Sequence, residues 1–295
     1  MFAPMQVFAL EIVEKGKDVR KMTLLAIFLI CLSALVLLYF WMIMPRMFKR
    51  PDAAPFREWL YAHRGLHDNH SDAPENSLRA FGKAADAGFG IELDVQMSKD
   101  GVPVVFHDYT LKRICGAEGK VCEYTFEELK QFSLCGTDQK IPRFEDVLKL
   151  VGGRVPLIVE LKIEAGDLSV CPAADKLLTD YGGMYCIESF NPLGIHWYRR
   201  NRPDVVRGQL AEAFSRGKEY TGPLYFLLEN LLFNWLTKPD FIAYNYRHAD
   251  MLSRRLCRGL YRCTAAAWTI KSEEELKEAG RHFDIFIFDS FLPER

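Results

Sequence analysis

Seven polar residues suited to catalysis or ligand binding stand at or just beyond short apolar runs: His63, Arg64, Glu92, Asp94, His107, Glu160 and Lys162. The runs, at 59–62, 91–95, 102–106 and 156–159, are typical of buried strands. Parallel strands in a barrel open their carboxyl ends on one face, so these residues are expected to share one pocket. Histidines transfer protons near neutral pH, carboxylates hold hard metal ions, and Arg and Lys hold phosphate. The set predicts metal-assisted cleavage of a phosphate ester.

Three carboxylates form the predicted metal site. Glu92 and Asp94 are two residues apart on an expected strand, so their side chains leave the same face. Burying both without a cation costs several kcal/mol. With Glu160 from another strand they suit Mg²⁺ or Ca²⁺ rather than zinc, which prefers His and Cys. Ion pairing of one or two of these acids with Arg64 or Lys162 is the alternative, but three acids exceed this local positive charge.

His63 and His107 are the candidate general acid and base. Either one alone is more often a structural histidine, but a pair at two strand ends beside carboxylates fits proton transfer to and from reacting oxygens. The remaining histidines lack such neighbours and are expected in loops or at the surface: His67, His70, His196, His248 and His282.

The candidate phosphate ligands are Arg64, with its planar fork of donors, and Lys162, with a point charge. Asn76, near an expected helix start, is a candidate donor to the same group, although ordinary helix capping also explains it. Phe190 and Trp268 follow later strands and are candidate walls of the substrate pocket, with a core position as the alternative for each.

Strand-like and helix-like segments alternate along the chain, which favours a parallel sheet. The helix expected over 75–87 places Leu78, Phe81 and Ala85 on one face. The stretch 108–142 exceeds an ordinary loop and is expected to fold over the pocket. Eight barrel strands result if 102–106 forms an extra hairpin. The strands are expected at 59–62, 90–96, 156–161, 184–189, 205–210, 240–245, 264–270 and 284–288, and further helices at 144–151, 172–181, 192–201, 224–236, 249–259 and 272–281.

The composition bounds the class of protein. The 295 residues carry 38 basic and 39 acidic side chains, which argues against a general nucleic-acid binder because such proteins need a basic surface. The chain has no Cys-x-x-Cys pair, so a zinc ribbon or a thioredoxin-type site is not expected. Free thiols are expected, with pairing of Cys115 and Cys122 as the alternative.

Residues 22–45 contain no charged side chain and predict a single transmembrane helix of roughly 30 Å. Tyr39 and Trp41 suit the membrane–water interface. The main alternative is a cleaved signal peptide, whose apolar core is usually about 7–15 residues and ends at a small-residue site. Basic residues flank both ends of this helix, so they leave open which side of the membrane the catalytic domain occupies. If translation starts at Met22, the basic residues before the helix are absent and the charge balance favours the opposite topology.

The domain boundaries follow from these patterns. Residues 1–21 form an N-terminal tail without an assigned role, and 46–57 form a basic linker with two prolines. The remaining 58–295 approach the ~250 residues typical of one TIM (β/α)8 barrel.

Several short motifs follow one another in a fixed order along the chain. They are Ala62-His63-Arg64-Gly65, Pro74-Glu75-Asn76-Ser77, Glu92-Leu93-Asp94-Val95, the run from Pro103 to Asp108, the run from Thr110 to Arg113, Ile141-Pro142, Glu160-Leu161-Lys162, Glu188-Ser189-Phe190-Asn191-Pro192 and Trp268-Thr269-Ile270. Over roughly 59–292 this series resembles the glycerophosphodiester phosphodiesterase family, and the combination is far more specific than any single tripeptide.

The resemblance implies a TIM barrel with a small insertion after the second strand, here about 108–142. It implies hydrolysis of glycerophosphodiesters to glycerol 3-phosphate and an alcohol, in which a glycerol hydroxyl attacks phosphorus first and water opens the resulting cyclic phosphate. It also implies site roles by residue: His63 and His107 as the acid–base pair, Glu92, Asp94 and Glu160 as ligands of Mg²⁺ or Ca²⁺, and Arg64 and Lys162 as phosphate ligands.

Two features depart from the common family pattern. The sequence stops at Arg295, soon after the last expected strand, so the closing helix is expected to be short or missing and the anchor segment to cover that end. The N-terminal span is absent from soluble members and is expected to place the pocket near a lipid surface.

Alternative functions follow from that location. One is a lysophospholipase D or a glycerophosphate-polymer hydrolase at the membrane, and another is a membrane-tethered binding protein without activity. All five acid–base and metal candidates are present, which argues against the inactive protein. The expected partners are therefore a glycerophosphodiester or lysophospholipid substrate and the membrane, with no nucleic acid and with the oligomeric state open.

Overall fold

The computed structural model describes residues 3–217 and 222–294, with side chains from residue 20 onward. It divides into two compact units, 1–42 and 43–295, which are described separately.

The first unit is a single helix, α1 (Ala3–Ile43), of 41 residues. Within it, Arg20–Ile43 is long and apolar enough to cross a membrane, and the most apolar part of this stretch is not buried in the protein. No other helix among residues 3–217 and 222–294 meets that test. A signal sequence near the N-terminus also passes this test of length and composition. Residues 3–21, expected as a tail, continue the same helix.

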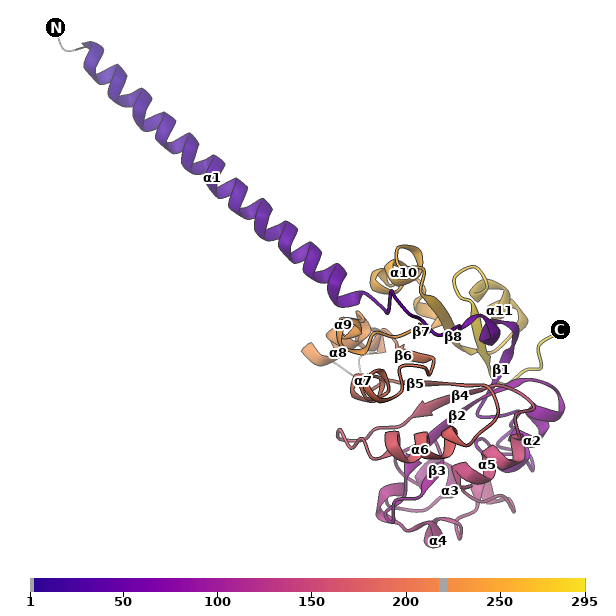
Figure 1. The fold of residues 1–295 in the computed structure, drawn as a ribbon. Coiled ribbons are helices and arrows are strands. Elements are labelled where there is room, and N and C mark those ends of the chain that lie inside the picture. The colour runs from indigo at the N-terminus through magenta and orange to yellow at the C-terminus, as the bar shows by residue number, and fades with distance from the viewer. Residues whose placement is uncertain (1–2, 218–221, 295) are drawn as a thin grey trace. The chain divides into compact units, whose positions relative to one another are not determined.

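The second unit is a closed eight-stranded parallel barrel surrounded by helices (Figure 1). Its strands run in the order β1, β2, β4, β5, β6, β7, β8, β9, and β1 pairs with both β2 and β9. The bounds are β1 (Leu60–His63), β2 (Gly90–Met97), β4 (Leu157–Leu161), β5 (Tyr185–Ser189), β6 (Arg207–Ala211), β7 (Phe241–Asn245), β8 (Thr264–Ile270) and β9 (Ile285–Phe288). The short β3 (Pro103–Val105) pairs antiparallel with β2, as the expected extra hairpin does. The predicted TIM barrel is confirmed.

Two glycines make room for the apolar half of the barrel. A Cβ at Gly90 would lie 2.6 Å from the Tyr61 ring, and one at Gly208 would lie 2.2 Å from the Phe241 ring. Both rings are fully buried and fill the amino-terminal half of the barrel with neighbours such as Ile158. Because side chains on a strand alternate between faces, Glu92 and Asp94 share the face of Gly90, further toward the carboxyl end.

The main helices lie close to the expected positions. They are α2 (Leu78–Asp86), α5 (Phe144–Val151), α6 (Val170–Thr179), α7 (Pro192–Asn201), α10 (Leu252–Gly259) and α11 (Glu273–Ala279). The first is shorter than expected because Asn76 has a positive φ of 56° and Ser77 caps the helix by accepting from the Ala80 amide. Leu78, expected on the buried face, is exposed. The single helix expected over 224–236 is two short helices, α8 (Pro223–Glu229) and α9 (Asn234–Thr237), separated by a turn at Leu231 with φ 57°.

The insertion after β2 contains only short helices: α3 (Lys112–Cys115), α4 (Phe126–Leu129) and the 3₁₀ turns η2 (Val121–Glu123) and η3 (Leu134–Gly136). It has a small apolar core of its own around Phe106, Leu111 and Leu129. All eight cysteines are free, including Cys115 and Cys122. After β9 no helix forms among the residues described up to 294.

Candidate active site

The carboxyl ends of the barrel strands surround a small cavity of about 90 Å³. It is lined by His63, Arg64, Glu92, His107, Glu160, Glu188, Phe190, Leu210, Trp268, Thr269 and Ile287. Seven of these were singled out from the sequence, and they come from β1, β2, β4 and β8 and from the segments that follow β1, β3 and β5. Asp94, Lys162 and Asn76 contact this group, as described below.

The three predicted metal ligands meet in one buried cluster. Carboxylate oxygens of Glu92, Asp94 and Glu160 all lie within 4.8 Å of one another. Asp94 and Glu160 are opposite each other in the β2–β4 ladder, and all three residues are at most 6% exposed. An all-oxygen set at this spacing is the donor chemistry that Mg²⁺ and Ca²⁺ prefer, so the residues present fit such an ion.

The acid groups carry more negative charge than their neighbours offset. Burial, followed by the charges of Asp94 and Glu160, raises the pKa of Glu92 well above its ordinary value. Burial also opposes ionisation of Asp94, but Lys162, Arg64 and the other positive or hydrogen-bonding neighbours together outweigh it and hold that pKa well below the usual range. Burial and the Asp94 charge raise the pKa of Glu160 although Lys162 opposes them. The cluster is therefore short of positive charge, and a divalent cation would remedy this deficit.

The candidate phosphate ligands contact these acids. Lys162 Nζ lies 2.9 Å from Glu160 Oε1 and 3.4 Å from Asp94 Oδ1. Arg64 lies 3.4 Å from Asp94 through Nε and 2.7 Å from Glu75 through a terminal nitrogen. These pairs match the alternative considered from the sequence, although they leave the cluster short of positive charge. These ion pairs also hold the Arg64 and Lys162 side chains beside the carboxylate cluster.

Asn76 donates a hydrogen bond to Asp94 Oδ2 at 2.9 Å, and its own Oδ1 is buried without a hydrogen-bond partner among the described residues. The helix cap is Ser77, one residue later. Asn76 therefore orients a candidate metal ligand in this structure, and its expected contact with phosphate stays a prediction.

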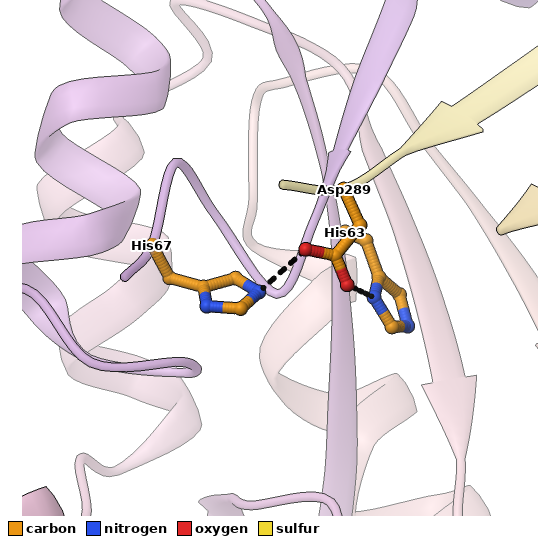
Figure 2. A group of neighbouring side chains, drawn as sticks. All are labelled: His63, His67 and Asp289. Atoms are coloured by element: carbon orange, nitrogen blue, oxygen red, sulfur yellow. Dashed lines mark hydrogen bonds and ion pairs between the residues drawn. The ribbon is translucent and has the colours of Figure 1, made fainter. Parts of the chain in front are cut away.

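His63 is held by a carboxylate that the sequence analysis did not single out. Asp289 follows β9, and its two oxygens contact two imidazoles, His63 Nδ1 at 3.0 Å and His67 Nε2 at 3.3 Å (Figure 2). This fixes the His63 ring with Nε2 3.9 Å from Glu92 Oε2. Burial, helped by the charge of Arg64, lowers the pKa of His63 to about 4 despite the bond to Asp289. His63 is therefore a neutral imidazole at pH 7.

His107 has a parallel arrangement. Its Nδ1 lies 2.6 Å from Asp108 Oδ1, and Arg113 Nε donates to Asp108 Oδ2 at 2.7 Å. Each candidate acid–base histidine thus uses Nδ1 on an aspartate, which leaves Nε2 for the substrate. His67, expected in a loop or at the surface, contributes to this arrangement through Asp289.

Glu75 connects the first strand's loop to the insertion. It accepts hydrogen bonds from Arg64 at 2.7 Å, from Asn69 at 2.8 Å and from both terminal nitrogens of Arg113 at 2.8 Å. Burial opposes its ionisation, but the donors from Arg113 and Arg64 prevail and lower the pKa of Glu75 to about 2. These bonds position Arg64 and Asp108 beside the cavity.

Glu75→Gln is expected to lower the free energy of unfolding by about 2 kcal/mol at pH 7, because the buried Arg64 charge loses the closer of its two carboxylate partners. The loss is modest for a buried pair, since Arg113 is nearly half exposed. The folded-state pKa of Glu75 is depressed, so its contribution is full above about pH 4.5 and fades toward pH 2. Urea unfolding of wild type and variant measures both effects.

The control for this prediction is Glu118→Gln, which removes an exposed carboxylate paired with Lys112. It should change stability by less than about 0.5 kcal/mol. A Glu75→Gln effect equal to the control, or one that persists unchanged at pH 3, would contradict the assigned role.

Two further polar atoms face the cavity without partners. Glu188 Oε2 and Trp268 Nε1 are buried and form no hydrogen bond with any described residue. Burial, with Glu160 and Asp94 nearby, raises the pKa of Glu188 well above its ordinary value. Phe190 packs edge-on against Trp268, with ring centroids 5.6 Å apart, which makes an aromatic wall. The wall predicted from Phe190 and Trp268 lies at the cavity, and Glu188 adds a polar group to it.

The comparisons agree with this geometry. The model of the glycerophosphoryl diester phosphodiesterase family matches residues 63–194. A glycerophosphodiester phosphodiesterase from Caldanaerobacter subterraneus is 32% identical over 163 residues, which cover 51% of this chain and 65% of that protein, just under two thirds of its length. Human glycerophosphodiester phosphodiesterase 1 is 26% identical over 271 residues, 79% of this chain and 78% of the human protein.

Solved structures show the same barrel. The glycerophosphodiester phosphodiesterase of Thermotoga maritima has a TM-score of 0.60 at 25% identity and covers 78% of this chain and 93% of its own. An Oleispira antarctica phosphodiesterase in complex with the product sn-glycerol-3-phosphate has a TM-score of 0.63 at 23% identity, over 78% and 92% of the two chains. These likenesses support membership of the chain in the glycerophosphoryl diester phosphodiesterase family, and the relatives named above are phosphodiesterases.

Proposed function

We propose that this protein hydrolyses glycerophosphodiesters to glycerol 3-phosphate and an alcohol, with a divalent cation, Mg²⁺ or Ca²⁺, on Glu92, Asp94 and Glu160. The observation that supports it most is the buried carboxylate cluster between two aspartate-held histidines at one mouth of the barrel. The reaction belongs to the turnover of phospholipid head groups and of glycerol. When bound, the cation supplies positive charge that lowers the pKa of the attacking hydroxyl and offsets charge on the phosphoryl oxygens.

His63 and His107 transfer the protons. His63 is neutral at pH 7, so its free Nε2 accepts the proton of the attacking hydroxyl. His107, fixed by Asp108, donates a proton to the leaving alkoxide. Their Nδ1–aspartate bonds keep each ring in one tautomer and orientation throughout the reaction.

Arg64 and Lys162 hold the phosphoryl group. In the cation-free protein they offset Asp94 and Glu160, and they become free to bind phosphate once those carboxylates are neutralised. Asn76 orients Asp94 and adds a nearby amide donor for the phosphate.

The cavity wall suits the glycerol part of the substrate. Glu188 and Trp268 present one unsatisfied oxygen and one unsatisfied N–H, which match the donor and acceptor capacity of hydroxyl groups. Phe190, Leu210 and Ile287 cover the carbon skeleton. A polyol fits this mixture of apolar surface and two polar atoms better than a long acyl chain does.

The test is turnover of the purified full chain in detergent with Mg²⁺ or Ca²⁺. The panel contains glycerophosphocholine, glycerophosphoethanolamine, glycerophosphoglycerol and lysophosphatidylcholine. We expect release of glycerol 3-phosphate from the three diesters, measured by mass spectrometry. Trp268→Phe keeps the aromatic wall but removes its N–H, so KM should rise about tenfold, as expected for one lost hydrogen bond. Release of a phosphorylated alcohol instead, or lysophosphatidic acid as the main product of the panel, would refute the proposal.

We propose further that Arg20–Ile43 is a retained single-span membrane anchor. The stretch is long and apolar enough to span a bilayer, its most apolar part is exposed, and it is longer than the apolar core of a usual signal peptide.

A further inference from the structure

The chain enters the barrel unit at its amino-terminal face, opposite the catalytic mouth. Ile43 O accepts from Asn234 Nδ2 at 2.8 Å, Met44 O accepts from Lys238 Nζ at 2.9 Å, and Arg46 N donates to Pro239 O at 3.0 Å. Ile43 and Pro45 are buried. Residues 43–50, called the docked segment below, are thus fixed to the barrel by specific contacts.

These contacts identify the face. Pro239 lies just before β7, and Pro203, whose carbonyl accepts from Arg46, lies before β6. Arg50 donates to the carbonyls of Tyr261 and Arg262, which come just before β8. Amino ends of parallel barrel strands share one face, and the candidate site lies at the opposite, carboxyl ends.

This face is strongly basic. Beside the docked segment lies a hollow of about 500 Å³ lined by Arg57, Arg254, Arg255, Arg258, Gly259, Arg262, Cys263, His282 and Asp284. Asp284 pairs with Arg258, and Asp52 and Glu58 are the exposed acids of the neighbouring turn. Within the described residues, Lys49, Arg255 and Arg262 have no acidic partner and are exposed. The face therefore carries excess positive charge in a chain whose net charge is only −1.

Apolar side chains project among these basic groups. Phe48 is 85% exposed and Leu260 is 57% exposed, and Met47 beside Phe48 is also exposed. An aromatic and an aliphatic side chain flanked by Lys and Arg are the composition of surfaces that enter the head-group layer of anionic membranes. A protein partner that binds through a hydrated polar interface has no use for the Phe48 ring, which is 85% exposed beside Lys49 and Arg50. A lipid surface accommodates the ring in its head-group layer and binds the basic side chains at the same time.

We propose that the amino-terminal face of the barrel binds anionic lipid head groups, with Phe48 and Leu260 in the head-group layer and Lys49, Arg255 and Arg262 on lipid phosphates. The inference rests on the proposed anchor, because the docked segment follows the span directly. The proposed orientation also indicates where the substrate comes from. With this face on the lipid, the mouth at His63 and His107 opens toward water, so the diesters that reach it are water-soluble head groups released from lipids rather than lysolipids drawn from the bilayer.

The experiment is oxidative footprinting of native side chains in the full chain, reconstituted in saturated phosphatidylcholine vesicles with or without phosphatidylglycerol. We expect oxidation of Phe48 and Met47 to slow about tenfold in the anionic vesicles, and roughly 1 M salt to reverse this. Tyr109, exposed in the insertion on the catalytic side, should oxidise equally in both. Turnover in the same vesicles is measured separately, so loss of activity and loss of lipid contact are distinguishable.

Arg255→Glu/Arg262→Glu should abolish the difference at Phe48 and leave turnover unchanged, because both residues lie far from the catalytic side. Lys99→Glu/Lys176→Glu, an equal charge change at exposed positions elsewhere, should retain it. The proposal is overturned by equal oxidation of Phe48 in both lipids, by protection already present in detergent (a second copy or a bound protein), by protection of Tyr109 instead, or by failure of the chain to float with the vesicles.

Discussion

Glu92→Gln is expected to abolish turnover while stabilising the cation-free protein. Glu92 has the weakest partners of the three carboxylates, since among the described residues its Oε2 contacts the Arg64 amide at 3.3 Å and His63 at 3.9 Å. Burial and the neighbouring acids disfavour its ionised form, so a neutral amide removes repulsion from the folded state. The same change removes a candidate cation ligand, and we expect kcat to fall by about 10³ or more.

Asp94→Asn is the matched control because its stability effect has the opposite sign. Asp94 is stabilised as an anion by Lys162, Arg64 and Asn76, so its neutralisation takes one carboxylate partner away from each of two buried cations. We expect Asp94→Asn to cost about 3 kcal/mol and Glu92→Gln to gain about 1 kcal/mol in excess EDTA at pH 7. Turnover of both variants should be lost.

The pH dependence of the Glu92 effect has a defined sign. A carboxyl group whose folded-state pKa is raised binds more protons when folded, so it destabilises the protein above its ordinary pKa of 4.5. The advantage of Glu92→Gln should therefore vanish as pH falls toward 4.5 and grow as pH rises. Urea unfolding in EDTA measures this difference in stability. In a second series, added Mg²⁺ or Ca²⁺ should raise the free energy of unfolding of wild type only. Normal turnover of wild type in excess EDTA, or equal stabilisation of the variant by the cation, would refute the metal site.

The barrel and its carboxylate cluster were predictable because the information is local. Apolar runs of β-branched and aliphatic residues mark the strands, and a polar residue at the carboxyl end of such a run is aimed at the mouth. Glu92 and Asp94 are placed together by the two-residue period of a strand, and β2 and β4 are neighbours in the sheet, so Glu160 lies opposite Asp94. Predicting that these three carboxylates meet required the order of the strands and no other long-range information.

Asp289 and Glu188 obey the same rule and could have been found by it. Asp289 directly follows Ile285–Phe288, and Glu188 lies near the carboxyl end of an apolar strand, beside Glu160 in the ladder. The pairing of His63 with Asp289 is harder to predict from the sequence. His63 and Asp289 are 226 residues apart, and only closure of the barrel between β1 and β9 brings them together.

Loop contacts and helix breaks are the parts that sequence patterns did not give. Glu75 and Arg113 belong to two loops 38 residues apart, and their contact depends on how the insertion folds back over the first strand's loop. The turn at Leu231 interrupts an apolar stretch that has helical composition throughout. There, Asn234 bonds to Ile43, 191 residues away, so tertiary contacts decide where the helix ends.

The two histidines are expected to differ in a way that leaving-group chemistry can separate. Replacing either His63 or His107 by Ala should lower kcat for glycerophosphocholine by about 10³ with the fold intact, since each transfers one proton. A base deprotonates the attacking hydroxyl whatever the leaving group is, whereas an acid matters only when the leaving alkoxide is strongly basic. The low pKa of His63 and its buried, Asp289-held ring favour it as the base.

Turnover of glycerophosphocholine and of a p-nitrophenyl glycerophosphate diester by each variant measures this difference. For His107→Ala the activated diester should recover about 10² of the lost rate, because p-nitrophenolate leaves without a proton. His63→Ala should stay slow on both substrates. Recovery by His63→Ala instead would exchange the two roles, and near-normal kcat in either variant would remove that histidine from the proton transfers. His196→Ala, which removes a histidine bonded to the Leu236 carbonyl on the outer helices, should turn over both substrates normally and serves as the control.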